Sequence, residues 1–142
     1  MDAVLDTNVA VSAAINPKGP PAEIIRAWRA HRFTWVTSPP LLQELEKTLR
    51  SPRLQRYLVW SEEERVEFLA LVRQAARVVQ PASRLEVVKE DPADNRVLEA
   101  AIAGRADYIV TGDHHLVAIG SYMDVRIVTP ARFVAIIATE LA

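Results

Sequence analysis

The chain has 142 residues, half of them hydrophobic and a quarter charged, which predicts one domain over residues 1–142 with a sizeable core. It has no cysteine, which excludes disulfides and thiolate sites. It shows no signal peptide and no apolar run of the roughly 18 residues that a membrane helix needs, so we expect a cytoplasmic protein without membrane contact. The formal net charge of −1 gives no overall attraction to nucleic acid, so any such binding must use a local basic patch.

The first stretch, Met1–Val11, reads M-D-A-V-L-D-T-N-V-A-V. Its apolar, β-favouring residues predict a buried strand over Met1–Asp6, and the apolar residues after Asn8 predict a helix to about Ile15. Asp6 therefore stands at the carboxyl end of a buried strand, which is where open α/β sheets bind their ligands.

Helical and extended patterns then alternate along the chain. Helical spacing, proline starts and a capping box predict helices at Ala22–His31, from Pro39 to Ser51, at Arg53–Val59, from Ser61 to Ala76, from Asp91 to Gly104, at Asp113–Ile119 and from Pro130 to about Thr139. Further strands are expected at Phe33–Thr37, Arg77–Gln80, Ala106–Thr111 and Val125–Val128, whereas Asn16–Pro21 and Ser83–Glu90 are interpreted as loops. Gly104 is expected to end its helix in the left-handed conformation. The alternation predicts an α/β fold, a three-layer α/β/α sandwich around a mainly parallel sheet of about five strands.

The four glycines form neither a G-x-G-x-x-G nor a Walker loop, and there is no G-x-S-x-G elbow, which leaves carboxylates as the candidates for chemistry. Four acids belong to the carboxyl edge of the predicted sheet: Asp6 and Asp113 follow strands, and Glu44 and Asp94 begin connecting helices. Carboxylates this close would repel each other, so a divalent cation is their natural partner. A set of oxygen ligands without histidine or cysteine favours Mg²⁺ or Mn²⁺ over Zn²⁺.

Each acid also has an ordinary structural explanation. Asp6 and Asp113 are suited to cap the helices that follow them, and Glu44 is suited to a solvated position near a helix start. Asp94 competes with Asp91: Asp91 suits the cap, and Asp94 leads an apolar stripe that points its carboxylate toward the sheet. Glu46 lies two residues from Glu44, and the stripe of Leu42, Leu45 and Leu49 leaves both acids flanking the buried face.

The ordered motifs D-T-N, an acid in the second connecting helix, D-P-x-D-N and A-D-Y-I-V-T-G-D resemble those of PIN-domain ribonucleases. The resemblance extends over nearly the whole chain and is strongest to VapC-like toxins of toxin–antitoxin pairs. It implies a ribonuclease that hydrolyses RNA phosphodiester bonds with Mg²⁺ or Mn²⁺, a homodimer, and an antitoxin that occludes the site. Position by position, it assigns Asp6, Glu44, Asp94 and Asp113 as the catalytic, metal-binding quartet, and Asn8 and Thr111 as supporting residues.

Thr7, Asn8, Thr111 and Asp91 are expected to hold carboxylates and waters around that quartet, with Asp91 also able to replace Asp94. Two basic strips are candidates for phosphate contacts, one around Trp28 (Arg26, Arg29, Arg32) and one around Tyr57 (Arg50, Arg53, Arg56), although a solvated helix face explains each as well. His114 and His115 fit a surface or substrate-rim role. The three tryptophans, Trp28, Trp35 and Trp60, are expected in the core or in subunit contacts.

Three other functions stay open. A haloacid-dehalogenase-type, Mg²⁺-dependent phosphatase needs D-x-D where this chain has Asp6-Thr7-Asn8, and a receiver domain needs a late lysine that the chain lacks. A non-catalytic PIN fold that binds RNA or another partner is the third alternative, and the complete acidic set argues against it.

Overall fold

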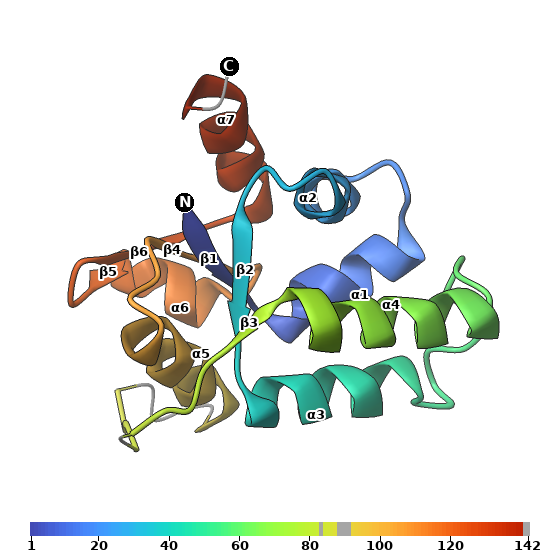
Figure 1. Cartoon of the computed structure of the whole chain (residues 1–142), viewed down its shortest axis with the longest axis horizontal. Helices are drawn as coiled ribbons and strands as arrows, with labels where there is room; N and C mark the ends of the chain where they lie inside the picture. The colour runs from blue at the N-terminus through green and yellow to red at the C-terminus, as the bar shows by residue number, and fades with distance from the viewer. Residues whose placement is uncertain (83, 88–91, 141–142) are drawn as a thin grey trace.

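The computed structural model describes residues 1–82, 84–87 and 92–140, and shows helices packed on both faces of one six-stranded sheet (Figure 1). The strands are β1 (Asp2–Leu5), β2 (Thr34–Thr37), β3 (Arg77–Val78), β4 (Tyr108–Val110), β5 (Ser121–Tyr122) and β6 (Val125–Val128). The helices are α1 (Thr7–Ile15), α2 (Pro20–Arg29), α3 (Pro39–Leu49), α4 (Glu62–Ala75), α5 (Pro92–Ala103), α6 (His114–Ile119) and α7 (Pro130–Glu140).

The strand order is β3-β2-β1-β4-β6-β5, and all neighbours are parallel except β5 and β6. The chain leaves β1 for β2 on one side and later returns to β4 on the other, so β1 and β4 flank the point where the topology reverses. Ligands of open α/β sheets bind at the carboxyl ends of strands at such a point. Because Leu5 is in register with Val110, Asp6 lies next to Thr111 at this edge.

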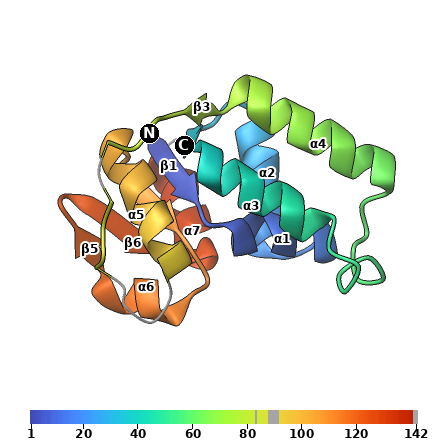
Figure 2. The same ribbon diagram turned by 90° about the horizontal axis from the view of Figure 1, so that it is seen from below.

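Both faces of the sheet are buried at the central strands β1 and β4, and alternate residues of each strand lie on opposite faces. Ala3 and Leu5 of β1 pack into a core formed with α1, α2, α4 and α7, whereas Val4 packs into a second core formed with α5 and α6. Helix α3 contributes to both cores. Figure 1 shows α5 and α6 on one side of the strands and α1 and α4 on the other, and Figure 2 shows α3 alongside α4. The predicted α/β/α sandwich is confirmed.

Aromatic side chains fill the first core. Trp28 and Trp35 meet edge to face with ring centroids 5.0 Å apart, and the Phe68 ring lies 4.8 Å from that of Trp60. Trp28 and Trp35 are buried and Trp60 is partly buried against the same cluster. The expectation that the tryptophans belong to the core is confirmed.

The structure differs from the predictions in several details. The sheet has six strands because β5 pairs with β6 through the turn Met123-Asp124, in which both residues have left-handed φ angles of 46° and 68°. The helix predicted at Arg53–Val59 is absent: residues 52–57 form successive turns, and residues 58–59 have no regular secondary structure. The second helix begins at Pro20, two residues before the predicted start, because a proline suits the first helical position.

Gly104 does not adopt the left-handed conformation, which instead falls on Arg105 at φ 50°. Its role is close packing, because a Cβ at this position would come within 2.5 Å of Val36 Cγ1. The glycine therefore lets α5 end directly against β2.

The loop expected at Ser83–Glu90 has no regular secondary structure over residues 84–87, and its other residues lie outside the described part of the chain. No described helix has the length and apolar character that a membrane span requires.

Candidate functional site

Asp6 occupies the position that caps α1, yet its side chain makes no capping hydrogen bond. The backbone N–H of Asp6 donates to the carbonyl of Val110 at 2.9 Å, which fixes the residue beside the end of β4. The Thr111 hydroxyl donates to Asp6 Oδ2 at 2.7 Å, and Asn8 Nδ2 donates to the same oxygen at 3.3 Å. The carboxylate is therefore held by one side chain from the end of β4 and one from α1, and not by a capping hydrogen bond.

Thr111 and Asn8 also hold the turn that follows β4. Thr111 Oγ1 accepts a hydrogen bond from the Asp113 N–H at 3.0 Å, and Asn8 Oδ1 accepts one from the Gly112 N–H at 3.3 Å. Both side chains thus connect the Asp6 carboxylate to the backbone that carries Asp113, as expected of residues that support a site.

Glu44 and Glu46 of α3 face different parts of the structure, and only one of them faces Asp6. Thr7 Oγ1 donates to Glu44 Oε2 at 3.1 Å, which directs Glu44 toward the start of α1. Glu46 turns away and pairs with Arg50 at 3.1 Å and with Arg73 of α4 at 2.7 Å. Of the two acids, only Glu44 lies beside Asp6.

The other two acids reach the same place from α5 and from the end of β4. Asp94, in the first turn of α5, is only 5% exposed. Asp113 caps α6, because its Oδ1 accepts a hydrogen bond from the His115 N–H at 2.7 Å. The capping explanation of Asp113 is therefore correct, but this bond uses only one of the two carboxylate oxygens. Asp91 lies outside the described residues. His114 and His115 are exposed on the first turn of α6.

Asp6, Glu44, Asp94 and Asp113 line one pocket of about 310 Å³. Its other described lining residues carry no charge: Thr7, Asn8, Val11, Ser12 and Thr48. His115 Nδ1, which is not part of the lining, lies 3.5 Å from Asp113 Oδ1. Burial raises the pKa of Asp6 from its ordinary value of 3.8 to about 6, the Thr111 hydrogen bond opposes this rise, and the negative charges of Glu44 and Asp113 add to it. The pocket is therefore a buried concentration of negative charge.

These donors fit a divalent cation in charge and in type, because all are oxygens of the kind that Mg²⁺ and Mn²⁺ prefer. Within the described part of the chain, however, no three acidic or histidine side chains are grouped closely enough to form a ready ligand set. Binding an ion here would require the carboxylates to move toward one another.

Two polar residues of the pocket were missed by sequence reasoning. Ser12 lies one helical turn after Asn8, and Thr48 lies one turn after Glu44. The i, i+4 spacing on α1 and α3 was the available signal, since such residues share a helix face.

The two basic strips differ in the structure. Trp28 is buried, so the aromatic platform expected in the first strip is wrong. Tyr57 is half exposed, and the Arg56 guanidinium lies 5.0 Å from the centroid of its ring.

Comparison with known proteins informs the family and the fold of the chain. Residues 2–115 match the family model of the PIN domain. The uncharacterized protein MJ1680 of Methanocaldococcus jannaschii is 29% identical over 139 residues, which cover 92% of this chain and 88% of that protein. The crystal structure of VapBC2 from Rickettsia felis bound to a DNA fragment from their promoter is similar with a TM-score of 0.58 and 18% identity, covering 91% of this chain and 98% of that one. At this identity, the structural match shows a shared fold.

Proposed function

The chain belongs to the PIN-domain family, and from this premise we propose that it is a metal-dependent ribonuclease, the toxin of a toxin–antitoxin pair. PIN domains are generally nucleases, and the acidic pocket lies at the sheet edge where such chemistry is expected. One observation carries the proposal: four acids from separate segments of the chain line one pocket at the carboxyl edge of the sheet.

Asp6, Glu44, Asp94 and Asp113 are the residues that would hold Mg²⁺ or Mn²⁺. When bound, such an ion supplies charge to offset the phosphate and lowers the pKa of a coordinated water. The chain's own contribution is positioning: Thr111 and Asn8 hold the Asp6 carboxylate, and Thr7 holds Glu44. Glu44 and Asp113 are partly exposed, whereas Asp6 and Asp94 are buried. Its exposure makes Glu44 suited to orient the attacking water.

Fold similarity to the VapBC2 structure and the motif resemblance support the toxin assignment. A cognate antitoxin protein and a homodimeric, cytoplasmic state belong to the same proposal. RNA is preferred to DNA as the substrate because the resemblance is to ribonucleases.

A non-catalytic PIN domain that binds RNA or another partner is the second candidate. The observation in its favour is that the described carboxylates are not grouped into a ready ligand set. The raised pKa of Asp6 argues against it, because a buried acid without chemistry to perform would only destabilise the fold.

A fluorogenic RNA assay with Mg²⁺, Mn²⁺ or EDTA tests the proposal. We expect cleavage with either metal, its loss in EDTA, and its loss in Asp6→Ala and Asp113→Ala with the fold retained by circular dichroism. Asp124→Asn, which changes an exposed acid on the β5–β6 turn, is the matched control and should cleave normally. Cleavage that persists in EDTA or in Asp6→Ala would refute the proposed site.

A further inference from the structure

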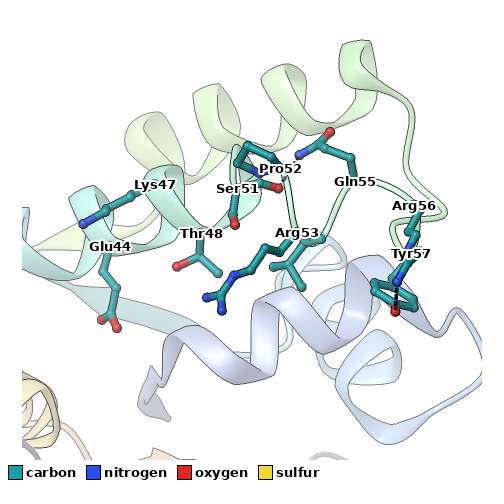
Figure 3. A pocket seen from close by; sticks show the side chains of 10 residues that line it. Glu44, Lys47, Thr48, Ser51, Pro52, Arg53, Gln55, Arg56 and Tyr57 are labelled. Atoms are coloured by element: carbon teal, nitrogen blue, oxygen red, sulfur yellow. Dashed lines mark hydrogen bonds between the residues drawn. The ribbon is translucent and has the colours of Figure 1, made fainter.

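A second, larger groove of about 990 Å³ adjoins the acidic pocket and shares Glu44 and Thr48 with it. The second half of α3 and residues 51–57 line this groove (Figure 3). The basic residues that line this groove are Lys47, Arg53 and Arg56. Glu44 is the one acid among its described lining residues, and it also lines the acidic pocket. The two cavities together place a basic surface directly next to an acidic one.

The basic residues of the groove are available to an external anion. Lys47 and Arg53 are exposed and form no ion pair with any carboxylate in the described part of the chain. Several arginines outside the groove are paired with carboxylates: Arg50 and Arg73 with Glu46, Arg77 with Asp2, and Arg96 with Glu99. Figure 3 shows the Arg53 side chain extending along the groove toward Thr48. A phosphate group is the anion that suits such a site next to a nuclease pocket.

An aromatic surface ends the groove. Tyr57 is 51% exposed, and Arg56 Nη2 donates to its hydroxyl at 2.9 Å while the guanidinium lies near the ring face. Exposed aromatic and guanidinium planes stack with the bases of single-stranded nucleic acids regardless of sequence.

The groove wall is held in place before any ligand binds. Gln55 Nε2 donates to the carbonyls of Leu49 and Ser51, both at 3.1 Å, which closes the turn after α3. The Val59 N–H donates to the Ala14 carbonyl at 2.7 Å and attaches the same segment to the end of α1. A wall fixed at both ends loses little conformational freedom when it binds a ligand.

The dimensions suit a short stretch of nucleic acid. Glu44, Lys47 and Thr48 share one face of α3 at i, i+3 and i+4, and Ser51 lines the groove just beyond the end of this helix. The rise of about 1.5 Å per residue extends the helical part of this face about 6 Å from Glu44, which is about two stacked nucleotides.

We propose that this groove binds the single-stranded RNA next to the scissile phosphate, an inference that rests on the proposed ribonuclease function. Lys47 and Arg53 contact phosphates of the RNA, and the Arg56 and Tyr57 side chains stack on a base. The exposed Tyr57 ring beside these cations argues for RNA over an acidic protein segment, because RNA supplies both phosphates for the cations and bases that stack on the ring.

The test measures binding and cleavage separately. Binding of a labelled 12-nucleotide single-stranded RNA is followed by fluorescence anisotropy in EDTA, between 50 and 200 mM salt. We expect the double variant Lys47→Ala/Arg53→Ala to weaken binding about tenfold and to reduce the salt slope of log K by about 1.4, since each phosphate contact contributes about 0.7. Tyr57→Ala should weaken binding about tenfold with the salt slope kept. With Mn²⁺, the KM for the same RNA should rise in both variants.

Arg132→Ala is the matched control, because Arg132 is an exposed arginine on α7, away from the groove (Figure 1). It should bind and cleave as the wild-type protein does. If both groove variants keep wild-type affinity and salt slope, the groove inference is overturned, and the surface serves another partner such as a protein. If the wild-type protein binds RNA through the groove but cuts none with Mg²⁺ or Mn²⁺, the ribonuclease function fails and the groove inference stands. A wild-type protein that neither binds nor cuts RNA overturns both.

Discussion

Replacing Asp6 by asparagine should stabilise the metal-free protein at neutral pH while it abolishes cleavage. The pKa of Asp6 rises from 3.8 to about 6 in the folded chain, chiefly because the carboxyl group is buried. At about 1.4 kcal/mol for each pH unit, ionising Asp6 in the fold costs about 3 kcal/mol at neutral pH, which is an upper bound for the gain. Asparagine removes the charge and keeps an acceptor for the Thr111 hydroxyl.

The gain must depend on pH. Between pH 4 and pH 6 the unfolded wild-type chain releases the Asp6 proton while the folded chain keeps it, so the wild-type free energy of unfolding falls as the pH rises through this window. Above pH 6 both states are ionised and this contribution becomes constant. The asparagine variant has no such proton, so its advantage should be near zero at pH 4 and largest above pH 6.

Urea unfolding in EDTA at pH 4.5, 5.5, 6.5 and 7.5, followed by tryptophan fluorescence, measures this difference, because Trp28 and Trp35 are buried. Asp124→Asn is the control and should follow the wild-type pH dependence, since its side chain is exposed. Adding Mn²⁺ at pH 7.5 should stabilise the wild-type protein more than the Asp6→Asn variant. A variant less stable than wild type at pH 7.5, or equally sensitive to pH, would refute the reasoning.

Two other changes test the site and the fold. Glu44→Gln should lower the cleavage rate at least about 100-fold, whereas Glu46→Gln, which lies two residues away and pairs with arginines, should stay within about twofold in the same RNA assay. Equal losses in both variants would contradict the assignment. Gly104→Ala should lower the free energy of unfolding by about 1–3 kcal/mol in urea titration, because its methyl group would lie 2.5 Å from Val36 Cγ1. The loss should shrink when it is measured in a Val36→Ala background, and a loss unchanged by Val36→Ala would show that crowding is not its cause.

The sequence predicted the layers of the fold because hydrophobic periodicity is a local property. It failed where local signals were weak or misleading. The β5–β6 turn uses Met123 and Asp124 in left-handed conformations that glycine or asparagine usually adopt, so no turn was recognised. Residues 53–59 carry Leu54 and Leu58 at helical spacing, but there the Gln55 side chain bonds to carbonyls at the end of α3 and a series of turns results.

The candidate site was predictable in outline, because parallel strands bring their carboxyl ends to one edge. Choosing between Glu44 and Glu46 was not possible from spacing alone. The choice depends on Thr7, which bonds to Glu44, and on Arg73, which is 27 residues from Glu46 in the chain. The groove next to the site could not be predicted either. Its basic residues Arg53 and Arg56 are placed by the turns after α3, where the sequence predicted a helix.

Asp6 and Asp113 each precede a helix in this fold, but their carboxylates make different contacts. An acid kept for capping would place its carboxylate on the N–H groups of its own helix, as Asp113 does, and its folded form would be stabilised. Asp6 stands at the same kind of position and makes no capping bond, although it is buried near other acids and its pKa is raised to about 6. Local choices that oppose stability are expected where function requires them. A cation between Asp6, Glu44 and Asp113 would offset the repulsion among these three carboxylates. The free energy that the buried Asp6 charge costs the metal-free fold should therefore be recovered as affinity for the ion.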